Sequence, residues 1–441
     1  MKTILLFGAG KSASVLITYL LRQAPLQGFQ LKVVDSDLSL AQSKLNGSPH
    51  GTALGFDSTH SQLRMAEIEQ ADLVISLLPP ALHQLVAMDC LQLHKNLLTA
   101  SYVSEELKKL DTELKSNDLL FLCEMGLDPG IDHMSAMALF ASIHQQGGTI
   151  HSFVSHCGGL VSSSSDNNPW HYKISWNPRN VVTAGQAGAQ FLLNGKKVAL
   201  LGEEVFAQEN AVAVDKVGTY GWYPNRDSLS YLSLYELKNL NTFIRTTLRH
   251  PDFIKGWNKL IRLSLTKDTP AYQLREATLG KGFAHHFERH HLQDLVSRYR
   301  KEDPIFDQQL HFLGVDGDTT PLSGDQFTPA QLLQESLERK LVLEKGDRDM
   351  IIMLHEIGYT VLGQRRKLNS QLVVEGENSI RTAMAKTVGL PLAMAAILVL
   401  QNKISLRGVQ IPTHKEIYEP VLAELEKEGI VFTESDGPAT N

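Results

Sequence analysis

Three small residues with the spacing Gly8-x-Gly10-x-x-Ala13 lie between a short apolar run and an apolar segment of helical length. A strand, a tight glycine turn and a helix in this order are typical of a dinucleotide site. Gly8 permits the turn, Gly10 lets the backbone approach a pyrophosphate, and Ala13 lets the helix pack on the strand. The helix start directs its N–H groups and its positive dipole end at the phosphates. The predicted cofactor contacts in this turn are Gly8, Gly10, Lys11, Ser12 and Ala13.

This turn has two alternative interpretations. The run Gly10-Lys11-Ser12 resembles the end of a P-loop, but a P-loop needs a glycine where this chain has Leu5. The spacing also occurs in ordinary glycine-rich turns of doubly wound sheets, because it is a weak motif on its own. The acidic residue after the next predicted strand favours the cofactor interpretation.

Asp35 follows the apolar segment 31–34, which we predict to be the second strand. A carboxylate at this point can accept hydrogen bonds from the hydroxyls of an adenosine ribose, and its charge would repel a 2′-phosphate. The alternative is that Asp35 is a solvated residue at a strand end. Together with the glycine turn, Asp35 predicts NAD as the cofactor, with NADP as the second choice.

The chain up to residue 122 alternates short apolar runs with helical segments, which indicates a parallel sheet covered by helices on both faces. We predict a Rossmann-type doubly wound α/β domain. Its strands are expected at 4–7, 31–34, 53–57, 71–78, 96–101 and 119–122, with helices around 38–46, 60–69, 81–93 and 103–116. Ligands of such sheets bind at the carboxyl ends of strands. Further cofactor contacts are therefore expected from Asp57, Ser58, Leu78, Pro79, Leu127 and Asp128.

Asp128 lies in the run Glu124–His133, directly after the predicted strand 119–122. Asp-Pro-Gly is typical of a turn, so a structural role is the alternative; for Asp132 we prefer a role in capping the following helix. Asp128 is expected at the carboxyl edge of the sheet, beside the nicotinamide, where a carboxylate can exchange protons with a substrate. It is a candidate acid–base.

Two runs in the middle of the chain carry further candidates. Cys157 follows a strand-like run and precedes two glycines, which permit close approach of the backbone to a ligand; a lone cysteine is more often a buried, inert residue. Arg226 and Arg249 belong to the runs 223–228 and 244–249. Each arginine could be solvated, but clustered arginines are what bidentate recognition of carboxylates requires.

Composition and charge argue against several classes of protein. The net charge is −6, without a single-sign block or basic stripe that would bind nucleic acid. The most apolar run, 390–400, is shorter than a membrane span and is predicted as a buried helix. Cys90, Cys123 and Cys157 show neither paired metal spacing nor a disulfide pattern. We expect a cytoplasmic protein with no metal ion, no nucleic-acid partner and no membrane partner.

The chain is long enough for two or three domains. We predict an NAD-binding Rossmann domain at 1–130, a mixed α/β substrate domain at 131–390 and a C-terminal segment, 391–441, that returns to the Rossmann domain. A helical insertion is expected at about 270–345. The evidence is strand-like runs at 149–155, 196–201 and 348–355, helical runs at 274–300 and 329–343, and loop-like stretches at 162–169 and 314–324.

The chain resembles saccharopine dehydrogenases of the glutamate-forming type, also called saccharopine reductases. Motifs in family order and near-family spacing are 99–104, 124–133, 157–160, 168–169, 172–176, 223–228, 247–249 and 384–389. The resemblance implies oxidation of saccharopine, an amine that joins the lysine side chain to the glutamate nitrogen. Hydride leaves the lysine ε-carbon for the nicotinamide, and water then cleaves the imine to glutamate and 2-aminoadipate 6-semialdehyde.

The resemblance also implies roles for individual residues and a place in lysine metabolism. The substrate contacts carried over are Ser101, Tyr102, Trp176, Arg226, Thr247, Leu248 and Arg249, and the groups for proton transfer are Asp128, Cys157 and Tyr102. The choice between Asp128 and Cys157 stays open. Fungal biosynthetic members resemble NADP sites with an arginine where this chain has Asp35 and Asp37. This departure favours NAD and lysine breakdown. We expect a homodimer.

Two alternative functions compete with this one. A weaker resemblance to carboxynorspermidine dehydrogenases predicts a substrate with a cationic polyamine tail, which would call for acidic residues opposite the arginines. A non-catalytic, NAD-binding regulatory protein would keep the fold without its chemistry. The presence of Asp128, Cys157 and Tyr102 favours an enzyme.

Overall fold

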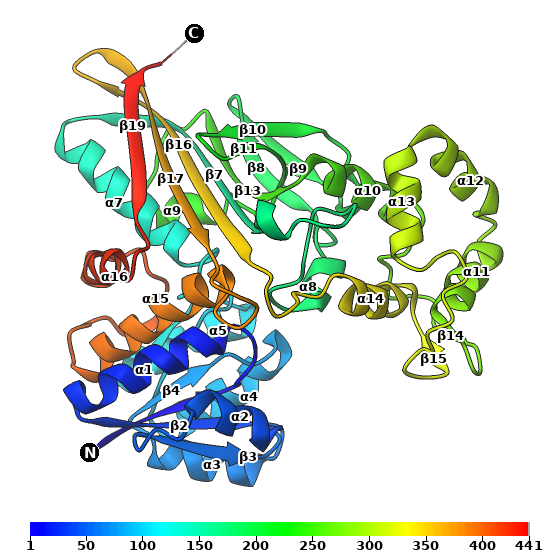
Figure 1. Ribbon diagram of the computed structural model, residues 1–441. Helices are drawn as coiled ribbons and strands as arrows, with labels where there is room; N and C mark the ends of the chain where they lie inside the picture. The colour runs from blue at the N-terminus through cyan, green and yellow to red at the C-terminus, as the bar shows by residue number, and fades with distance from the viewer. Residues whose placement is uncertain (440–441) are drawn as a thin grey trace. The chain divides into compact units, whose positions relative to one another are not determined.

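Residues 1–148 and 380–432 form one unit of the computed structural model, and residues 149–379 and 433–441 form the second (Figure 1). The structure describes residues 1–439. The boundaries between the units therefore lie after residues 148 and 379, and not at the predicted positions 130 and 390. Helix α7 (Ile131–Gln145) packs against α16 (Lys415–Lys427) and so belongs to the first unit. The last strand, β19 (Phe432–Pro438), pairs in the sheet of the second unit instead of returning to the first.

The first unit is built on a seven-stranded sheet with the order β18-β6-β5-β4-β1-β2-β3, whose pairs are all parallel. The strands are β1 (Lys2–Phe7), β2 (Phe29–Asp35), β3 (Gly51–Gly55), β4 (Leu73–Ser76), β5 (Asn96–Thr99), β6 (Leu120–Leu122) and β18 (Gly408–Gln410). The apolar residues of β1 and β4 are fully buried because helices cover both faces. The predicted doubly wound sheet is confirmed, and the C-terminal segment adds β18 as an edge strand.

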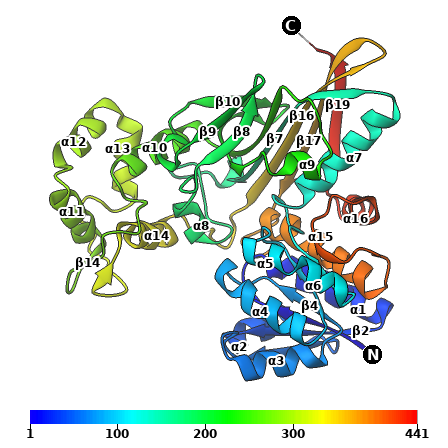
Figure 2. The same cartoon turned by 180° about the vertical axis from the view of Figure 1, so that it is seen from behind.

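Helices flank this sheet on both sides, as Figures 1 and 2 show from opposite directions. They are α1 (Ala13–Gln27), α2 (Leu38–Leu45), α3 (Ser61–Gln70), α4 (Pro80–Gln92), α5 (Glu105–Lys109), α6 (Asp111–Ser116), α7, α15 (Ala383–Leu400) and α16. Buried side chains of α3, α4, α5 and α6 pack on one face of the sheet. On the other, α1 packs against α15.

Helix α15 corrects the expectation that no apolar segment reaches membrane-spanning length. Its 18 residues have a mean hydropathy of 1.9, and 83% of them are buried. The apolar run extends backwards from Leu390 to Ala383, where the Thr382 side chain caps the helix. Within the first unit α15 is a core helix: a Cβ added at Gly389 would lie 2.9 Å from the Leu16 nitrogen in α1.

The second unit contains a ten-stranded mixed sheet with the main order β10-β11-β13-β7-β16-β17-β19, extended by β8, β9 and β12. The strands not yet given are β7 (Thr149–Val161), β8 (Ala189–Leu193), β9 (Lys196–Leu200), β10 (Asn210–Val214), β11 (Gly218–Pro224), β12 (Arg226–Asp227), β13 (Thr242–Arg249), β16 (Asp349–Val361) and β17 (Gln364–Glu375). β7 and β16 are longer than predicted, and β13 was not predicted as a strand. β13 lies parallel to β7, and β16 lies antiparallel on its other side.

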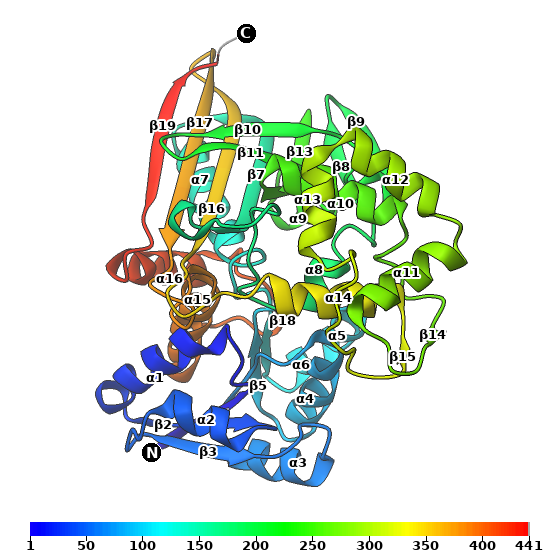
Figure 3. The same ribbon diagram turned by 45° about the vertical axis from the view of Figure 1, so that its right-hand side comes forward.

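Helices of this unit lie mostly beyond one end of the sheet, and Figure 3 brings them forward. They are α8 (Pro178–Val182), α9 (Tyr231–Leu234), α10 (Pro251–Arg262), α11 (Leu279–Arg289), α12 (Gln293–Glu302), α13 (Pro304–Phe312) and α14 (Pro329–Lys340), beside a two-stranded ribbon of β14 (Tyr272–Gln273) and β15 (Gln326–Phe327). The single helix predicted at 274–300 was wrong. His291, with φ 55°, separates α11 from α12.

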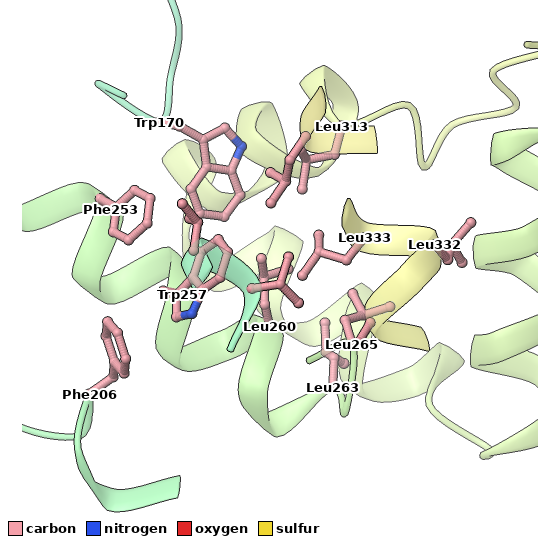
Figure 4. Packing of buried hydrophobic residues seen from close by; sticks show 14 of the residues in the cluster. Trp170, Phe206, Phe253, Trp257, Leu260, Leu263, Leu265, Leu313, Leu332 and Leu333 are labelled. Atoms are coloured by element: carbon pink, nitrogen blue, oxygen red, sulfur yellow. The ribbon is translucent and has the colours of Figure 1, made fainter. Parts of the chain in front are cut away.

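A large apolar cluster joins these helices to the sheet (Figure 4). Trp170 packs edge-on against Trp257 of α10, and the rings of Trp257 and Phe253 are stacked with centroids 4.9 Å apart. Tyr172 contacts Phe253 from the same loop as Trp170. The cluster fixes the loop 170–176 and the start of α10, the two segments that flank the end of β13.

Candidate active site

The glycine turn of the first unit has the geometry that a dinucleotide needs. Gly8 has φ 98°, and its N–H donates to the Val34 carbonyl at 2.8 Å. A Cβ added there would lie 2.9 Å from the Leu77 carbonyl oxygen, so only glycine fits. At Gly10 a Cβ would meet no protein atom within 4 Å. Gly10 is not required by packing, and its open space fits a phosphate group at the start of α1.

Asp35 supports this turn and also reaches the place expected for a ribose. Its Oδ2 accepts the Ala9 N–H at 2.8 Å, and its Oδ1 accepts the Asp37 N–H at 3.0 Å. The neighbouring Asp37 caps α2 instead, because its carboxylate accepts the N–H groups of Ser39 and Leu40. Asp35 is therefore the acidic group at the end of β2 that can meet ribose hydroxyls.

Four other predicted cofactor positions lie at the ends of β3 and β4. Asp57 follows β3, is exposed, and accepts hydrogen bonds at 2.8 Å from both the N–H and the hydroxyl of Thr59. Ser58 is buried. Leu78 and Pro79 follow β4, next to Leu77, whose N–H donates to the Phe7 carbonyl at 2.9 Å. All are at the carboxyl edge of the sheet, as predicted.

Asp128 lies in a tightly folded loop between β6 and α7. The Gly126 N–H donates to the Pro129 carbonyl at 2.9 Å, and a Cβ at Gly130 would lie 2.0 Å from the Gly126 carbonyl oxygen. Leu127 is buried whereas Asp128 is half-buried. Asp132 was expected to cap the helix, but α7 begins at Ile131 with Gly130 at the cap position, so Asp132 lies within the helix and accepts the Gly130 N–H at 2.7 Å. The loop thus holds one carboxylate, that of Asp128, at a fixed and partly open position.

Ser101 and Tyr102 follow β5 at the same edge, and both are half-buried. Two residues that sequence analysis missed hold this segment. His83 Nε2 lies 2.7 Å from Ser101 Oγ, and Glu124 Oε1 accepts the Val103 N–H at 3.1 Å. His83 belongs to no motif, and Glu124 opens the run 124–133, in which the sequence assigned it no role. Only the pairing of β4 with β5 and of β5 with β6 brings them to Ser101.

In the second unit, Cys157, Thr247, Leu248 and Arg249 lie on neighbouring strands instead of loops. Cys157 of β7 is buried and pairs with Thr247 of β13 and Met353 of β16. Directly paired residues of adjacent strands point to the same face, so Cys157 and Thr247 share one face. Leu248 faces the other way. A Cβ at Gly158 would lie 2.7 Å from the Leu248 Cβ and carbonyl oxygen, so Gly158 serves the close approach of two strands and not of a ligand.

Arg249 lies at the end of β13, on the face of Thr247, and is 4% exposed. Its guanidinium is 5.0 Å from the Tyr172 ring centroid and 5.7 Å from that of Phe253. Nη1 donates to the Leu248 carbonyl at 2.7 Å, whereas Nε is buried without a hydrogen-bond partner. Among residues 1–439 no carboxylate forms an ion pair with it. Burying a guanidinium without a counter-charge costs desolvation free energy, and a bound anion would offset that cost.

The other two predicted substrate contacts differ in burial. Trp176 is half-buried, and its Nε1–H donates to the Tyr172 hydroxyl at 3.0 Å, which joins it to the ring beside Arg249. Arg226 is exposed in the short strand β12 and has φ 52°. Arg245, which was not among the predicted site residues, is buried on the same face as Arg249 and lies over the Tyr231 ring at 4.6 Å.

One group in the described part of the chain has the composition of a metal site: His171, His250 and Asp252, whose possible ligand atoms lie within 4.8 Å of one another. His171 Nδ1 is 2.6 Å from Asp166 Oδ2. His250 Nδ1 accepts the Asp252 N–H at 3.3 Å as the cap of α10, so this nitrogen is already engaged. The positive end of the helix dipole also disfavours a cation. We assign this group to helix capping.

Comparison with known proteins gives consistent matches over both units. Residues 4–122 match the family described as "Saccharopine dehydrogenase NADP binding domain", and residues 126–430 match "Saccharopine dehydrogenase C-terminal domain". The mitochondrial alpha-aminoadipic semialdehyde synthase of Bos taurus is 34% identical over 452 residues, covering 98% of this chain and 47% of the relative. The chain thus spans about half the length of that curated relative.

Two further relatives match over their whole length. The saccharopine dehydrogenase (NADP(+), L-glutamate-forming) of Schizosaccharomyces pombe is 30% identical over 449 residues, covering 98% of this chain and 99% of the relative. The solved structure of apo saccharopine dehydrogenase (L-Glu forming) from Saccharomyces cerevisiae superposes with a TM-score of 0.85 at 27% identity, covering 99% of this chain and 100% of the other.

Proposed function

The chain belongs to the saccharopine dehydrogenase family, and from this premise we propose that it oxidises saccharopine with a nicotinamide dinucleotide, giving L-glutamate and 2-aminoadipate 6-semialdehyde. The observation that carries the proposal is the buried Arg249, whose Nε has no hydrogen-bond partner. Saccharopine has three carboxylates, and a planar guanidinium binds a carboxylate through two parallel hydrogen bonds. The relatives at 30% identity or more that are named above are a saccharopine dehydrogenase and an alpha-aminoadipic semialdehyde synthase, so the carboxynorspermidine alternative is not favoured.

We assign substrate binding to the residues that the family resemblance implies. In the second unit, Arg249 would bind one carboxylate of the substrate, and the exposed Arg226 would bind a second. Thr247 and the Leu248 backbone, on the same strand as Arg249, would contact the substrate beside it. Trp176 would contact the carbon chain. In the first unit, Ser101 and Tyr102 would donate hydrogen bonds. Desolvated arginine–carboxylate pairs of this kind discriminate strongly against substrates that lack the carboxylate.

Proton transfer is assigned to the half-buried Asp128, with Cys157 and Tyr102 as further candidates. The secondary amine of saccharopine must lose a proton before hydride leaves the ε-carbon, and a carboxylate can accept it. Bound nicotinamide dinucleotide accepts the hydride. Water then adds to the imine, and Asp128 would move a proton from the oxygen of the carbinolamine and return one to the departing glutamate nitrogen. Protons and electrons balance without a further reactant.

The cofactor is a nicotinamide dinucleotide held by the glycine turn and Asp35. Gly10 leaves space for the pyrophosphate, and the Asp35 carboxylate at the end of β2 is positioned for ribose hydroxyls. The matched domain family and the S. pombe relative both carry NADP in their names. The acidic side chain supports a preference for NAD in this chain, because it would repel a 2′-phosphate.

The decisive experiment is the reduction of NAD or NADP by saccharopine, followed at 340 nm, with identification of the amino acid released. We expect L-glutamate. Lysine, glutamate and 2-aminoadipate serve as control substrates. Release of lysine instead of glutamate, or reduction only with a polyamine adduct, would overturn the proposal. A chain that binds the cofactor and oxidises none of these substrates would be the regulatory alternative.

Two further expectations stay predictions. One is location in the cytoplasm, which suits the three buried thiols, and the other is a homodimer.

A further inference from the structure

His83, in the first turn of α4, connects two serines that end neighbouring strands. Its Nδ1 lies 2.8 Å from Ser76 Oγ and its Nε2 lies 2.7 Å from Ser101 Oγ. Ser76 is fully buried at the end of β4, His83 is 6% exposed, and Ser101 is half-buried after β5. The three side chains form a linear series that begins in the core and ends at an accessible hydroxyl.

The imidazole carries a single proton under ordinary conditions. Burial lowers the pKa of His83 to about 4. At neutral pH one ring nitrogen is therefore a donor and the other an acceptor. Which nitrogen has the proton is decided by the partners at the two ends.

Ser76 decides the tautomer. Within residues 1–439, His83 Nδ1 is the one hydrogen-bond partner of Ser76 Oγ. A buried hydroxyl must donate its proton to an acceptor or lose a hydrogen bond. Ser76 O–H therefore donates to Nδ1, and the ring proton lies on Nε2. Nε2–H in turn donates to Ser101 Oγ, so the Ser101 hydroxyl proton is left to point outward.

We propose that His83 is a positioning residue that makes the Ser101 hydroxyl a hydrogen-bond donor to a carboxylate of the substrate. This inference rests on the proposed function, because it takes a carboxylate of saccharopine as the acceptor. A hydroxyl that is free to rotate would spend part of its time presenting a lone pair to the carboxylate, which repels it. His83 would remove that orientation without touching the substrate.

Two amide variants separate the ends of the series. In His83→Gln the side-chain amide reaches the position of Nε2 and can still donate to Ser101. In His83→Asn the shorter amide reaches the position of Nδ1, keeps Ser76 and loses Ser101. We expect His83→Asn to raise KM for saccharopine by about three- to tenfold, because the freed Ser101 hydroxyl can still donate but loses its preferred orientation. His83→Gln should leave KM for saccharopine nearly unchanged, and KM for the cofactor should change little in either variant.

A double-variant cycle tests whether the effect passes through Ser101. Ser101→Ala alone should raise KM for saccharopine, and adding His83→Asn should raise it no further. The exposed His94, just beyond the other end of α4, provides the matched control, because His94→Asn makes the same substitution at the opposite end of the helix from His83. Equal effects of Gln and Asn at position 83, or a full Asn penalty in the Ser101→Ala background, would overturn the proposal.

The tautomer provides a readout that does not depend on turnover. Imidazole ¹⁵N shifts of histidine-labelled protein, with His83→Gln to assign the signal, should show a neutral ring protonated at Nε2. A ring protonated at Nδ1 would overturn the positioning role even if saccharopine is the substrate. Failure of saccharopine to reduce either cofactor, together with an Nε2–H tautomer, would instead overturn the proposed function and leave the donor geometry standing.

Discussion

Most candidate residues of the first unit lie in loops that follow strands, whereas those of the second unit, apart from Trp176, lie within strands. The glycine turn and the loop of Asp128 each follow a parallel strand, and Asp35 ends one. Cys157 and Thr247 instead lie side by side on β7 and β13. A loop site is therefore built mainly from consecutive residues, and a strand site from residues brought together by register.

The glycines of the two units show the same difference. At Gly10 an added Cβ would meet no protein atom within 4 Å, so packing does not require this glycine, and we expect it to serve the cofactor. At Gly158 an added Cβ would be 2.7 Å from Leu248, so the glycine serves the packing of two strands. The sequence shows a glycine in both cases, and the neighbouring strand distinguishes them.

The largest expected effect comes from the loop carboxylate of the first unit. Asp128→Ala should lower kcat by ~10²–10⁴-fold if Asp128 is the sole acid–base, while the cofactor Kd stays nearly unchanged. Steady-state kinetics and cofactor titration measure the two quantities. A loss below tenfold would contradict a sole role; shared duty with Cys157 would then appear as a strongly non-additive loss in the double variant.

The strand site should respond through substrate binding. Arg249→Ala should weaken transition-state binding by ~2–4 kcal/mol, because a carboxylate would lose a desolvated guanidinium. Arg249→Lys keeps the charge but not the planar fork and should recover only part of kcat/KM. The exposed Arg226 should give a smaller loss, because solvent screens it. Unchanged kcat/KM in Arg249→Ala would mean that the arginine only packs on Tyr172 and Phe253.

The sequence predicted the first unit better than the second for a physical reason. Parallel strands buried on both faces are continuous apolar runs, and a strand–turn–helix motif identifies its own ends. β13 carries arginines and threonines at alternate positions, which gives no continuous apolar run, and it was missed as a strand. His83 and Glu124 were missed because no local pattern marks a side chain that supports another loop. The face shared by Cys157 and Thr247 depends on a register that one strand alone does not contain.

Two buried histidines, one in each unit, allow a comparison through pH. Burial lowers the pKa of His83 and of His286 to about 4, each below its ordinary value of 6.5. At a pH between about 4 and 6.5, each of these histidines binds a proton in the unfolded chain but not in the folded chain. The free energy of unfolding should therefore fall as pH drops from about 6.5 to 4, by up to about 3 kcal/mol for each histidine.

Urea unfolding at pH 7 and pH 5 measures this dependence. His83→Gln and His286→Gln should each flatten it, and the exposed His94→Gln should leave it as steep as before. If the two units unfold separately, each variant should change only one of two transitions. An unaltered slope in both variants would contradict the neutral state of these rings.

Alanine at the two contrasting glycines should have opposite consequences. Gly158→Ala should lower the free energy of unfolding by ~1–3 kcal/mol, because the added methyl group overlaps Leu248 on the adjacent strand. Gly10→Ala should leave thermal stability almost unchanged and weaken cofactor binding. Calorimetry and cofactor titration on both variants provide the test. Loss of stability at Gly10 with an unchanged cofactor Kd would reverse the assignment of the two glycines.

The smallest expected effect concerns the choice of cofactor at Asp35. The unmodified chain should prefer NAD, because the carboxylate repels a 2′-phosphate. Alanine at this position would also remove the acceptor of the Ala9 N–H and loosen the glycine turn. Asp35→Asn is the cleaner variant, since an amide oxygen can still accept that N–H without charge. It should shift the ratio of kcat/KM for NAD and NADP by about tenfold toward NADP, equivalent to ~1.4 kcal/mol.

Asp37→Asn is the control for this prediction. It removes a charge two residues away, on a carboxylate that caps α2, and it should shift the ratio of kcat/KM far less. Equal kcat/KM for the two cofactors in the unmodified chain would show that the Asp35 carboxylate supports the turn and does not select the cofactor.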